Sequence, residues 1–157
     1  MFDPSSESPQ VKNWIIHCDG SALPNPGRMA WGAVIVAPDG TRQTLSQASH
    51  RTGCNNEAEL MALMASLRAL PSAHCSVEVY SDNSVLVTQL MQPDTKPIAR
   101  LAALFEEARE LLGQFDTCVV RWVPRHRNTE ADALARSALG MPPKAAATAM
   151  TRHHHRR

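Results

Sequence analysis

The sequence lacks any uninterrupted apolar run long enough to cross a bilayer, and its polar first ten residues, MFDPSSESPQ, are unlike a signal peptide. We therefore expect a cytoplasmic protein that does not enter a membrane. It also lacks a CxxC pair among its four cysteines, which argues against a zinc site and favours reduced, buried thiols. Wholesale disorder is excluded as well, because 43% of the residues are hydrophobic and only 20% are charged.

What the sequence does contain is enough for one folded domain. A chain of 157 residues can bury a core, and the pattern predicts a flexible leader over 1–12, a folded domain over 13–140 and a basic, disordered tail over 141–157. Four of the 16 Lys and Arg residues and none of the 15 Asp and Glu residues lie in that tail, so the body is slightly acidic although the net charge is +1. A polyanionic partner would therefore have to be bound through a local arrangement of charge.

Hydrophobic periodicity predicts an α/β fold. Residues 14–19 carry apolar side chains on both faces, which is typical of a central strand. Two more strands follow around the turn Pro38-Asp39-Gly40, and then a helix over 55–70 that Asn55 or Asn56 can cap. The remaining order is strand, two helices, strand and helix. These elements together predict a five-stranded mixed sheet flanked by helices.

Carboxylates recur where the predicted elements begin or end. Asp19 and Asp82 follow two strands, Glu57 and Glu59 lie early in the first helix, and Asp132 lies in the first turn of the last helix. Ligands collect beyond strand ends in α/β sheets, and a cluster of like charges is tolerated mainly when a divalent cation neutralises it. An all-oxygen set suits Mg²⁺ or Mn²⁺ better than zinc. Helical spacing does not choose between the two glutamates, which point about 200° apart.

Each of these aspartates also has a simpler structural interpretation. Asp19 precedes Gly20 and Asp82 precedes Asn83, so both fit turns. The run Thr129-Glu130-Ala131-Asp132 fits a capping box, in which the last acid supports the start of a helix. The joint appearance of the acids at several element ends favours the metal interpretation.

Four motifs then give the chain a family resemblance: DGSALPNPGRMAWGAVI, NNEAELMAL, VYSDNSVLV and WVPRHRNTEADALARSA. In this order and spacing they resemble type 1 ribonuclease H from about Trp14 to Gly140. Residues 83–118 hold three basic and five acidic side chains, so the chain resembles a short form without the family's basic protrusion. The resemblance implies a ribonuclease H-like fold and endonucleolytic hydrolysis of the RNA strand of RNA/DNA hybrids. It further implies two bound Mg²⁺ ions, with Mn²⁺ as an alternative.

The resemblance also assigns the metal ligands. Asp19 bridges both ions, Glu59 and Asp82 complete one site, and Asp132 holds the other. The motif NNEAEL is similar to the family form in which the second glutamate is the ligand, so Glu57 is expected to face solvent.

Accessory residues follow from the same resemblance. His126 matches a loop histidine that aids proton transfer and product departure. The positions that match nucleic-acid contacts are Gly20, Ser21, Asn25, Asn55, Asn56, Arg125 and Arg127.

Two other functions stay open at this point, and we expect a monomer in each case. One is a non-catalytic, ribonuclease-H-like module that binds nucleic acid or protein; the acidic body and the missing protrusion argue for it, and the four carboxylates argue against it. The other is a different nuclease of the same superfamily, such as a 3′-to-5′ exonuclease.

Overall fold

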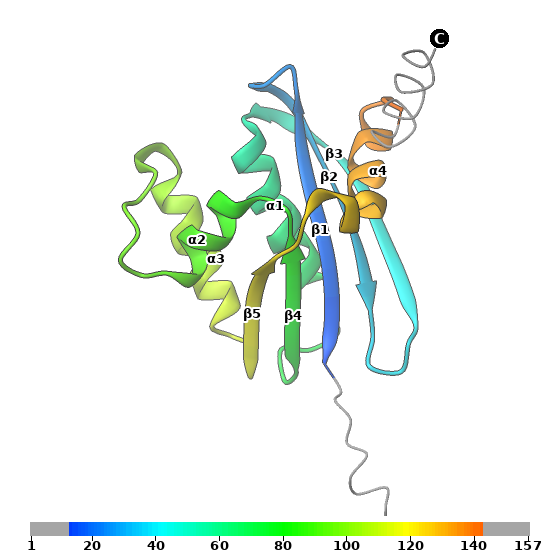
Figure 1. Ribbon diagram of the computed structural model, residues 1–157, viewed down its shortest axis with the longest axis vertical. Coiled ribbons are helices and arrows are strands. Elements are labelled where there is room, and N and C mark those ends of the chain that lie inside the picture. The colour runs from blue at the N-terminus through cyan, green and yellow to red at the C-terminus, as the bar shows by residue number, and fades with distance from the viewer. Residues whose placement is uncertain (1–12, 143–157) are drawn as a thin grey trace, which may run out of the picture.

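The computed structural model describes residues 13–142, so the predicted leader and all but the first two residues of the predicted tail lie outside the described part. Within that part, no helix is both long and apolar enough to span a bilayer. Five strands form a single sheet in the order β3-β2-β1-β4-β5 (Figure 1). Their bounds are Trp14–Leu23 for β1, Gly27–Val36 for β2, Arg42–Gly53 for β3, Ser76–Ser81 for β4 and Thr117–Trp122 for β5.

The sheet is mixed, as the sequence predicts. The first three strands pair antiparallel, with a tight turn over 37–41 between β2 and β3 in which the Gly40 N–H donates to the Ala37 carbonyl at 2.8 Å. Parallel pairing joins β1 to β4 and β4 to β5. The first strand is therefore central, with an antiparallel neighbour on one side and a parallel neighbour on the other.

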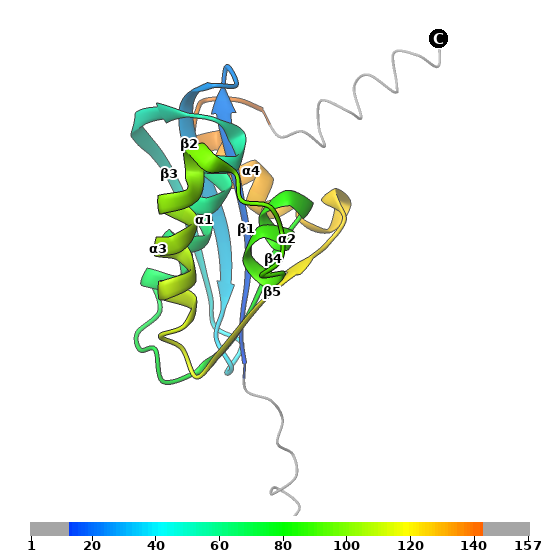
Figure 2. The same ribbon diagram turned by 90° about the vertical axis from the view of Figure 1, so that its left-hand side faces the viewer.

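Helices cover both faces of this sheet (Figure 2). Their bounds are Asn55–Arg68 for α1, Ser84–Met91 for α2, Ala102–Leu112 for α3 and Thr129–Ala138 for α4, with short 3-10 turns at Ala99–Leu101 (η2) and Arg125–Arg127 (η3). The main core lies between the sheet and the layer of α1 and α3, and includes the fully buried Ile16, Leu63 and Phe105. Helix α4 packs on the other face, mainly against β2.

The predicted caps of α1 are wrong. The N-cap is Cys54, whose Sγ accepts from the Glu57 N–H at 3.4 Å. Neither asparagine is free to cap, because the Asn55 side chain binds the backbone of β1 and the Asn56 side chain binds Asn83. At α2, Asn83 is the N-cap and its Oδ1 accepts from the Leu86 N–H at 3.0 Å.

A glycine on β2 lets α4 approach the sheet closely. A Cβ placed on Gly32 would lie 2.6 Å from both the Ala131 carbonyl oxygen and the Ala135 nitrogen. Both are backbone atoms, so they cannot turn aside as a side chain could. Gly32 is also the register partner of Asp19, so the contact lies level with the candidate site.

We expect Gly32→Ala to lower the free energy of unfolding by about 1–3 kcal/mol, because α4 must move away from β2. Urea unfolding of the full chain measures the change. Gly113→Ala is the matched control, since its added Cβ would lie at an ordinary 3.5 Å from the Arg109 carbonyl oxygen. Similar losses in both variants would contradict the tight packing of α4.

Candidate metal centre

The site lies where β1 continues past its parallel neighbour. Pairing between β1 and β4 ends at His17 and Tyr80, whereas β1 remains paired with β2 as far as Leu23. Backbone groups on the uncovered edge of β1 need other partners, because buried peptide groups are seldom left unpaired. Side chains supply them, and each comes from an element next to the site.

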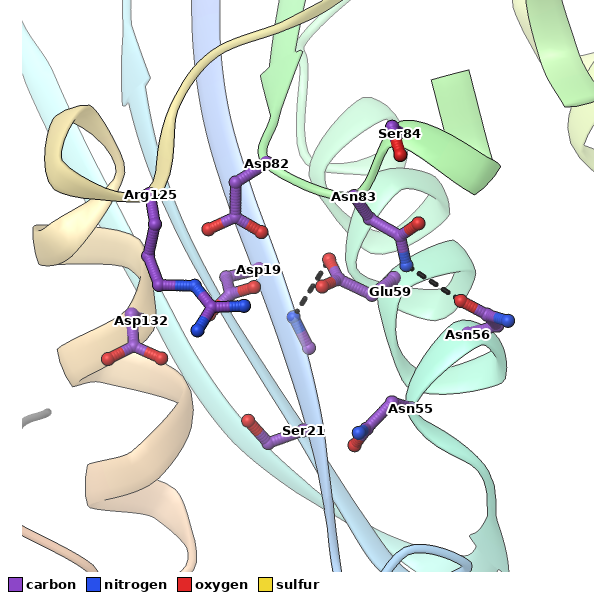
Figure 3. Close-up of a pocket in the computed structure, with 11 residues that line it drawn as sticks. Asp19, Ser21, Asn55, Asn56, Glu59, Asp82, Asn83, Ser84, Arg125 and Asp132 are labelled. Carbon is purple, nitrogen blue, oxygen red and sulfur yellow. Dashed lines mark hydrogen bonds between the residues drawn. The ribbon is translucent and has the colours of Figure 1, made fainter. Parts of the chain in front are cut away.

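Helix α1 satisfies two of these edge groups from one face. Glu59 Oε1 accepts from the Gly20 N–H at 3.2 Å (Figure 3), and Asn55 Oδ1 accepts from the Ala22 N–H at 2.8 Å. The two side chains are four residues apart and therefore lie on the same face of the helix. Gly20 makes this approach possible, since a Cβ there would collide with the backbone of Ala58. The prediction that the first strand ends at Asp19 is wrong, because β1 continues to Leu23 and Gly20 serves a close contact between helix and strand instead of a turn.

Three carboxylates converge beside this uncovered edge of β1. Ligand oxygens of Asp19 from β1, Glu59 from α1 and Asp82 from the end of β4 all lie within 4.8 Å of one another. Asp132 from α4 lines the same hollow, of about 340 Å³, on its other side (Figure 3). The donor set contains oxygen and no sulfur or imidazole, so it fits a hard cation such as Mg²⁺ or Mn²⁺.

Burial makes these carboxylates hard to ionise. Desolvation, reinforced by the nearby Asp82 and Asp132 carboxylates, raises the pKa of Asp19 to about 8. Desolvation and the Asp19 carboxylate also raise the pKa of Glu59 well above its ordinary range. A bound cation would reverse both effects, because it favours the charged form of each ligand.

The structure distinguishes Glu59 from Glu57. Glu59 is 5% exposed and points into the site, whereas Glu57 points toward β3. The expectation that Glu57 faces solvent is wrong: its side chain is only 18% exposed and lies 3.8 Å from the Arg51 guanidinium. It sits against Gly53 at the end of β3 and lines a hollow beside the start of α1.

The capping box predicted at α4 does not form. The N-cap is Asn128, and within the described residues it makes no side-chain cap bond. Instead Asn128, 2% exposed, donates from Nδ2 to the Cys18 carbonyl at 2.9 Å, on the same uncovered edge of β1. Its own carbonyl accepts from the Asp132 N–H at 3.1 Å. The Asp132 carboxylate is therefore left to the site.

The predicted basic loop divides between two hollows. Arg125 lines the carboxylate hollow together with Gly20 and Ser21, and its side chain points into it (Figure 3). His126 and Arg127 line a neighbouring hollow beside His17. The structure thus brings Arg125 to the carboxylates and leaves His126 exposed at the rim of the adjacent hollow.

The asparagines predicted to contact nucleic acid line a second hollow, which adjoins the first. Asn55 and Asn56 line both it and the carboxylate hollow, so the two adjoin. Asn25 lies at its far side and accepts from the Asn55 N–H at 3.0 Å. Arg100 of η2 also lines it, with a guanidinium nitrogen 3.6 Å from Cys54 Sγ.

Sequence reasoning missed three polar residues of the site. Asn83 donates from Nδ2 to Asn56 Oδ1 at 2.8 Å and so ties the end of β4 to α1. No local pattern marks Arg100, because its nearness to α1 depends on tertiary packing. Asn128 looked like an ordinary residue before a helix, and no local signal distinguishes a cap from a contact made 110 residues away.

Comparison with known proteins agrees with this architecture. A family model described as reverse transcriptase-like matches residues 17–138. The bifunctional protein Rv2228c of Mycobacterium tuberculosis is 32% identical over 136 residues, which are 85% of this chain and 37% of that protein. The chain therefore spans little more than a third of that relative. A ribonuclease H of Cupriavidus pinatubonensis is 33% identical over 77% of this chain and 91% of its own.

Solved structures confirm the predicted ribonuclease H-like fold. The N-terminal RNase H domain of Rv2228c matches with a TM-score of 0.71 and 33% identity, over 80% of this chain and 98% of that one. LC11-RNase H1 in complex with an RNA/DNA hybrid matches with a TM-score of 0.69 and 28% identity, over 80% and 96% of the two chains.

The raised pKa of Asp19 predicts how stability depends on pH. Between its unfolded value near 4 and its folded value of about 8, the folded protein holds a proton that the unfolded chain releases, so raising the pH lowers stability. Asp19→Asn removes this penalty. The free energy of unfolding of Asp19→Asn minus that of the parent protein should therefore increase by at least about 1 kcal/mol between pH 5 and pH 8. Urea unfolding of both proteins in EDTA measures this difference. Asp94→Asn, at an exposed loop position, is the control, and a pH-independent gain in Asp19→Asn would contradict the prediction.

Proposed function

Because the chain belongs to the ribonuclease H family, we propose that it cleaves the RNA strand of RNA/DNA hybrids at internal positions. The observation that carries this proposal is the convergence of Asp19, Glu59 and Asp82 within 4.8 Å, with Asp132 on the other side of the same hollow. The neighbour solved with an RNA/DNA hybrid supports the choice of substrate.

The four carboxylates would hold two divalent cations. We propose Mg²⁺, with Mn²⁺ as a substitute, because the donors are all oxygen. When bound, such a pair supplies an activated water and stabilises the leaving oxygen of the phosphate. Asp19 lies between the other ligands and would bridge the pair, with Glu59 and Asp82 on one side and Asp132 on the other. Strand β1 fixes Asp19, and the Gly20 N–H holds Glu59 by a hydrogen bond. These two ligands are therefore held in place before substrate binds.

The hybrid would lie along the two adjoining hollows. Asn25, Asn55 and Asn56 offer amide groups to the minor groove, where an RNA-containing duplex displays 2′-hydroxyls. Gly20 and Ser21 let the backbone of the RNA strand come close to the carboxylates. Phosphate contacts would come from Arg125 in the first hollow and from Arg127 beyond it.

His126 would act as an accessory residue. It lies one residue from Arg125 on the exposed turn η3, from which it could take part in proton transfer or product departure. We further propose that the protein works as a cytoplasmic monomer.

Cleavage assays with paired glutamine variants test the function. Glu59→Gln keeps an oxygen for the Gly20 N–H but removes a cation ligand, so hybrid cleavage should fall about 10³-fold, which corresponds to about 4 kcal/mol. Glu57→Gln, two residues away, should lose far less activity, because Glu57 lines the second hollow but is not one of the converging carboxylates. The assay uses a hybrid labelled at one end of the RNA, in Mg²⁺ and in Mn²⁺. Stepwise trimming would indicate an exonuclease, and hybrid binding without cleavage by the folded parent would indicate a non-catalytic module.

Arginine variants test the path of the substrate. Arg125→Ala should weaken hybrid binding. It should also make the slope of log K against log salt concentration shallower by about 1, the change expected when one phosphate contact is lost. Arg127→Ala should have a smaller effect, because its side chain lines the neighbouring hollow. Fluorescence anisotropy with labelled hybrid in Ca²⁺ at several salt concentrations measures both. A larger effect for Arg127→Ala would move the expected path to the other side of η3.

A further inference from the structure

Asn128 connects the two sides of the carboxylate hollow. Its side-chain amide reaches the Cys18 carbonyl, directly before Asp19, and its own carbonyl receives the Asp132 N–H. The first contact joins β1 to the start of α4, and the second forms the first turn of α4. One residue thus links the backbone positions of Asp19 and Asp132.

The Asn128 side chain contacts the Cys18 carbonyl instead of capping its own helix. Asparagine at an N-cap normally accepts from the second or third N–H of the helix, but Asn128 makes no such bond within the described chain. Its Oδ1 is buried and has no hydrogen-bond partner in the part of the chain that the structure describes. Burying an amide with an unsatisfied oxygen is unfavourable, so helix stability alone does not explain this arrangement.

Asp132 depends on the link through Asn128 more than the other three carboxylates do. Asp19, Glu59 and Asp82 already form one tight group, braced by the Glu59 contact with Gly20 and the Asn83 contact with Asn56. Asp132 contacts the Asp19 carboxylate but is not one of the three carboxylates that lie within 4.8 Å of one another, and it comes from a helix that packs mainly against β2.

We infer that Asn128 is a positioning residue, which holds Asp132 at the distance from Asp19 that a second divalent cation requires. The inference rests on the two-cation function proposed above. It predicts that loss of the Asn128 amide weakens the cation on the Asp132 side while sparing the cation held by the other three carboxylates.

Other tethers of α4 provide matched controls. Ser46 Oγ donates to the Leu134 carbonyl at 2.7 Å, and the exposed Arg42 and Glu130 form an ion pair at 2.6 Å. Both tethers join α4 to β3, which carries none of the four carboxylates. Ser46→Ala therefore removes one hydrogen bond of α4 without disturbing the link to β1.

Calorimetric titration of the full chain with Mn²⁺ tests the inference directly. We expect two binding events in the parent and in Ser46→Ala. In Asn128→Ala and Asn128→Ser the event assigned to Asp132 should weaken at least about 10-fold, while the other changes less than about 3-fold. The assignment comes from Asp132→Asn, which should abolish the same event. Serine keeps good N-cap chemistry, but its hydroxyl is one bond too short to replace the amide, so it should not rescue binding.

Hybrid cleavage provides the second readout. Both Asn128 variants should lower kcat with little change in KM, because the substrate-binding hollows are intact. Wild-type behaviour in Asn128→Ser, equal weakening of both events, or the same loss in Ser46→Ala would overturn the inference. A parent protein with a single binding event would also overturn it. Two events without hybrid cleavage would instead refute the proposed function, since the titration would still report on Asn128.

Discussion

The whole site depends on one mismatch in strand length. Strand β1 extends to Leu23, but its pairing with β4 ends at His17, so the last part of β1 has an uncovered edge in the middle of the domain. A buried edge of this kind must have its peptide groups satisfied. Here side chains replace the missing strand: Asn128 meets the Cys18 carbonyl, Glu59 meets Gly20 and Asn55 meets Ala22. The residues that complete the sheet are thus the same ones that build or brace the metal centre.

This arrangement explains why the carboxylates are both buried and close together. Glu59 cannot accept from the Gly20 N–H without entering the neighbourhood of Asp19, and Asp82 follows directly from the end of the shorter strand. The cost is electrostatic, as the raised pKa values of Asp19 and Glu59 indicate. The same short distances between the carboxylates would favour binding of a divalent cation, because ligands already held by the backbone need little reorganisation on binding.

Much of the fold and the four carboxylates could be predicted from the sequence, because they depend on local patterns and on spaced motifs. The central strand follows from apolar residues on both faces, and the end of β4 from the asparagine that follows Asp82. The end of β1 could not be predicted, because the strand continues past Asp19 and Gly20 to Leu23. The caps could not be predicted. Cys54 caps α1 because both following asparagines are engaged elsewhere, and Asn128 leaves its cap unfilled because its amide reaches β1. Such competition is decided by tertiary contacts, which no local propensity encodes.

The proposed substrate is a polyanion although the domain is slightly acidic, so the placement of charge around the two adjoining hollows matters. Arg125 lines the first, Arg100 and Glu57 line the second, and neutral asparagines occupy the region that they share. Cations bound to the carboxylates would reverse the sign of charge at the centre of this path. Affinity for a nucleic acid would then rise with cation loading, so that metal occupancy would affect binding as well as the proposed chemistry.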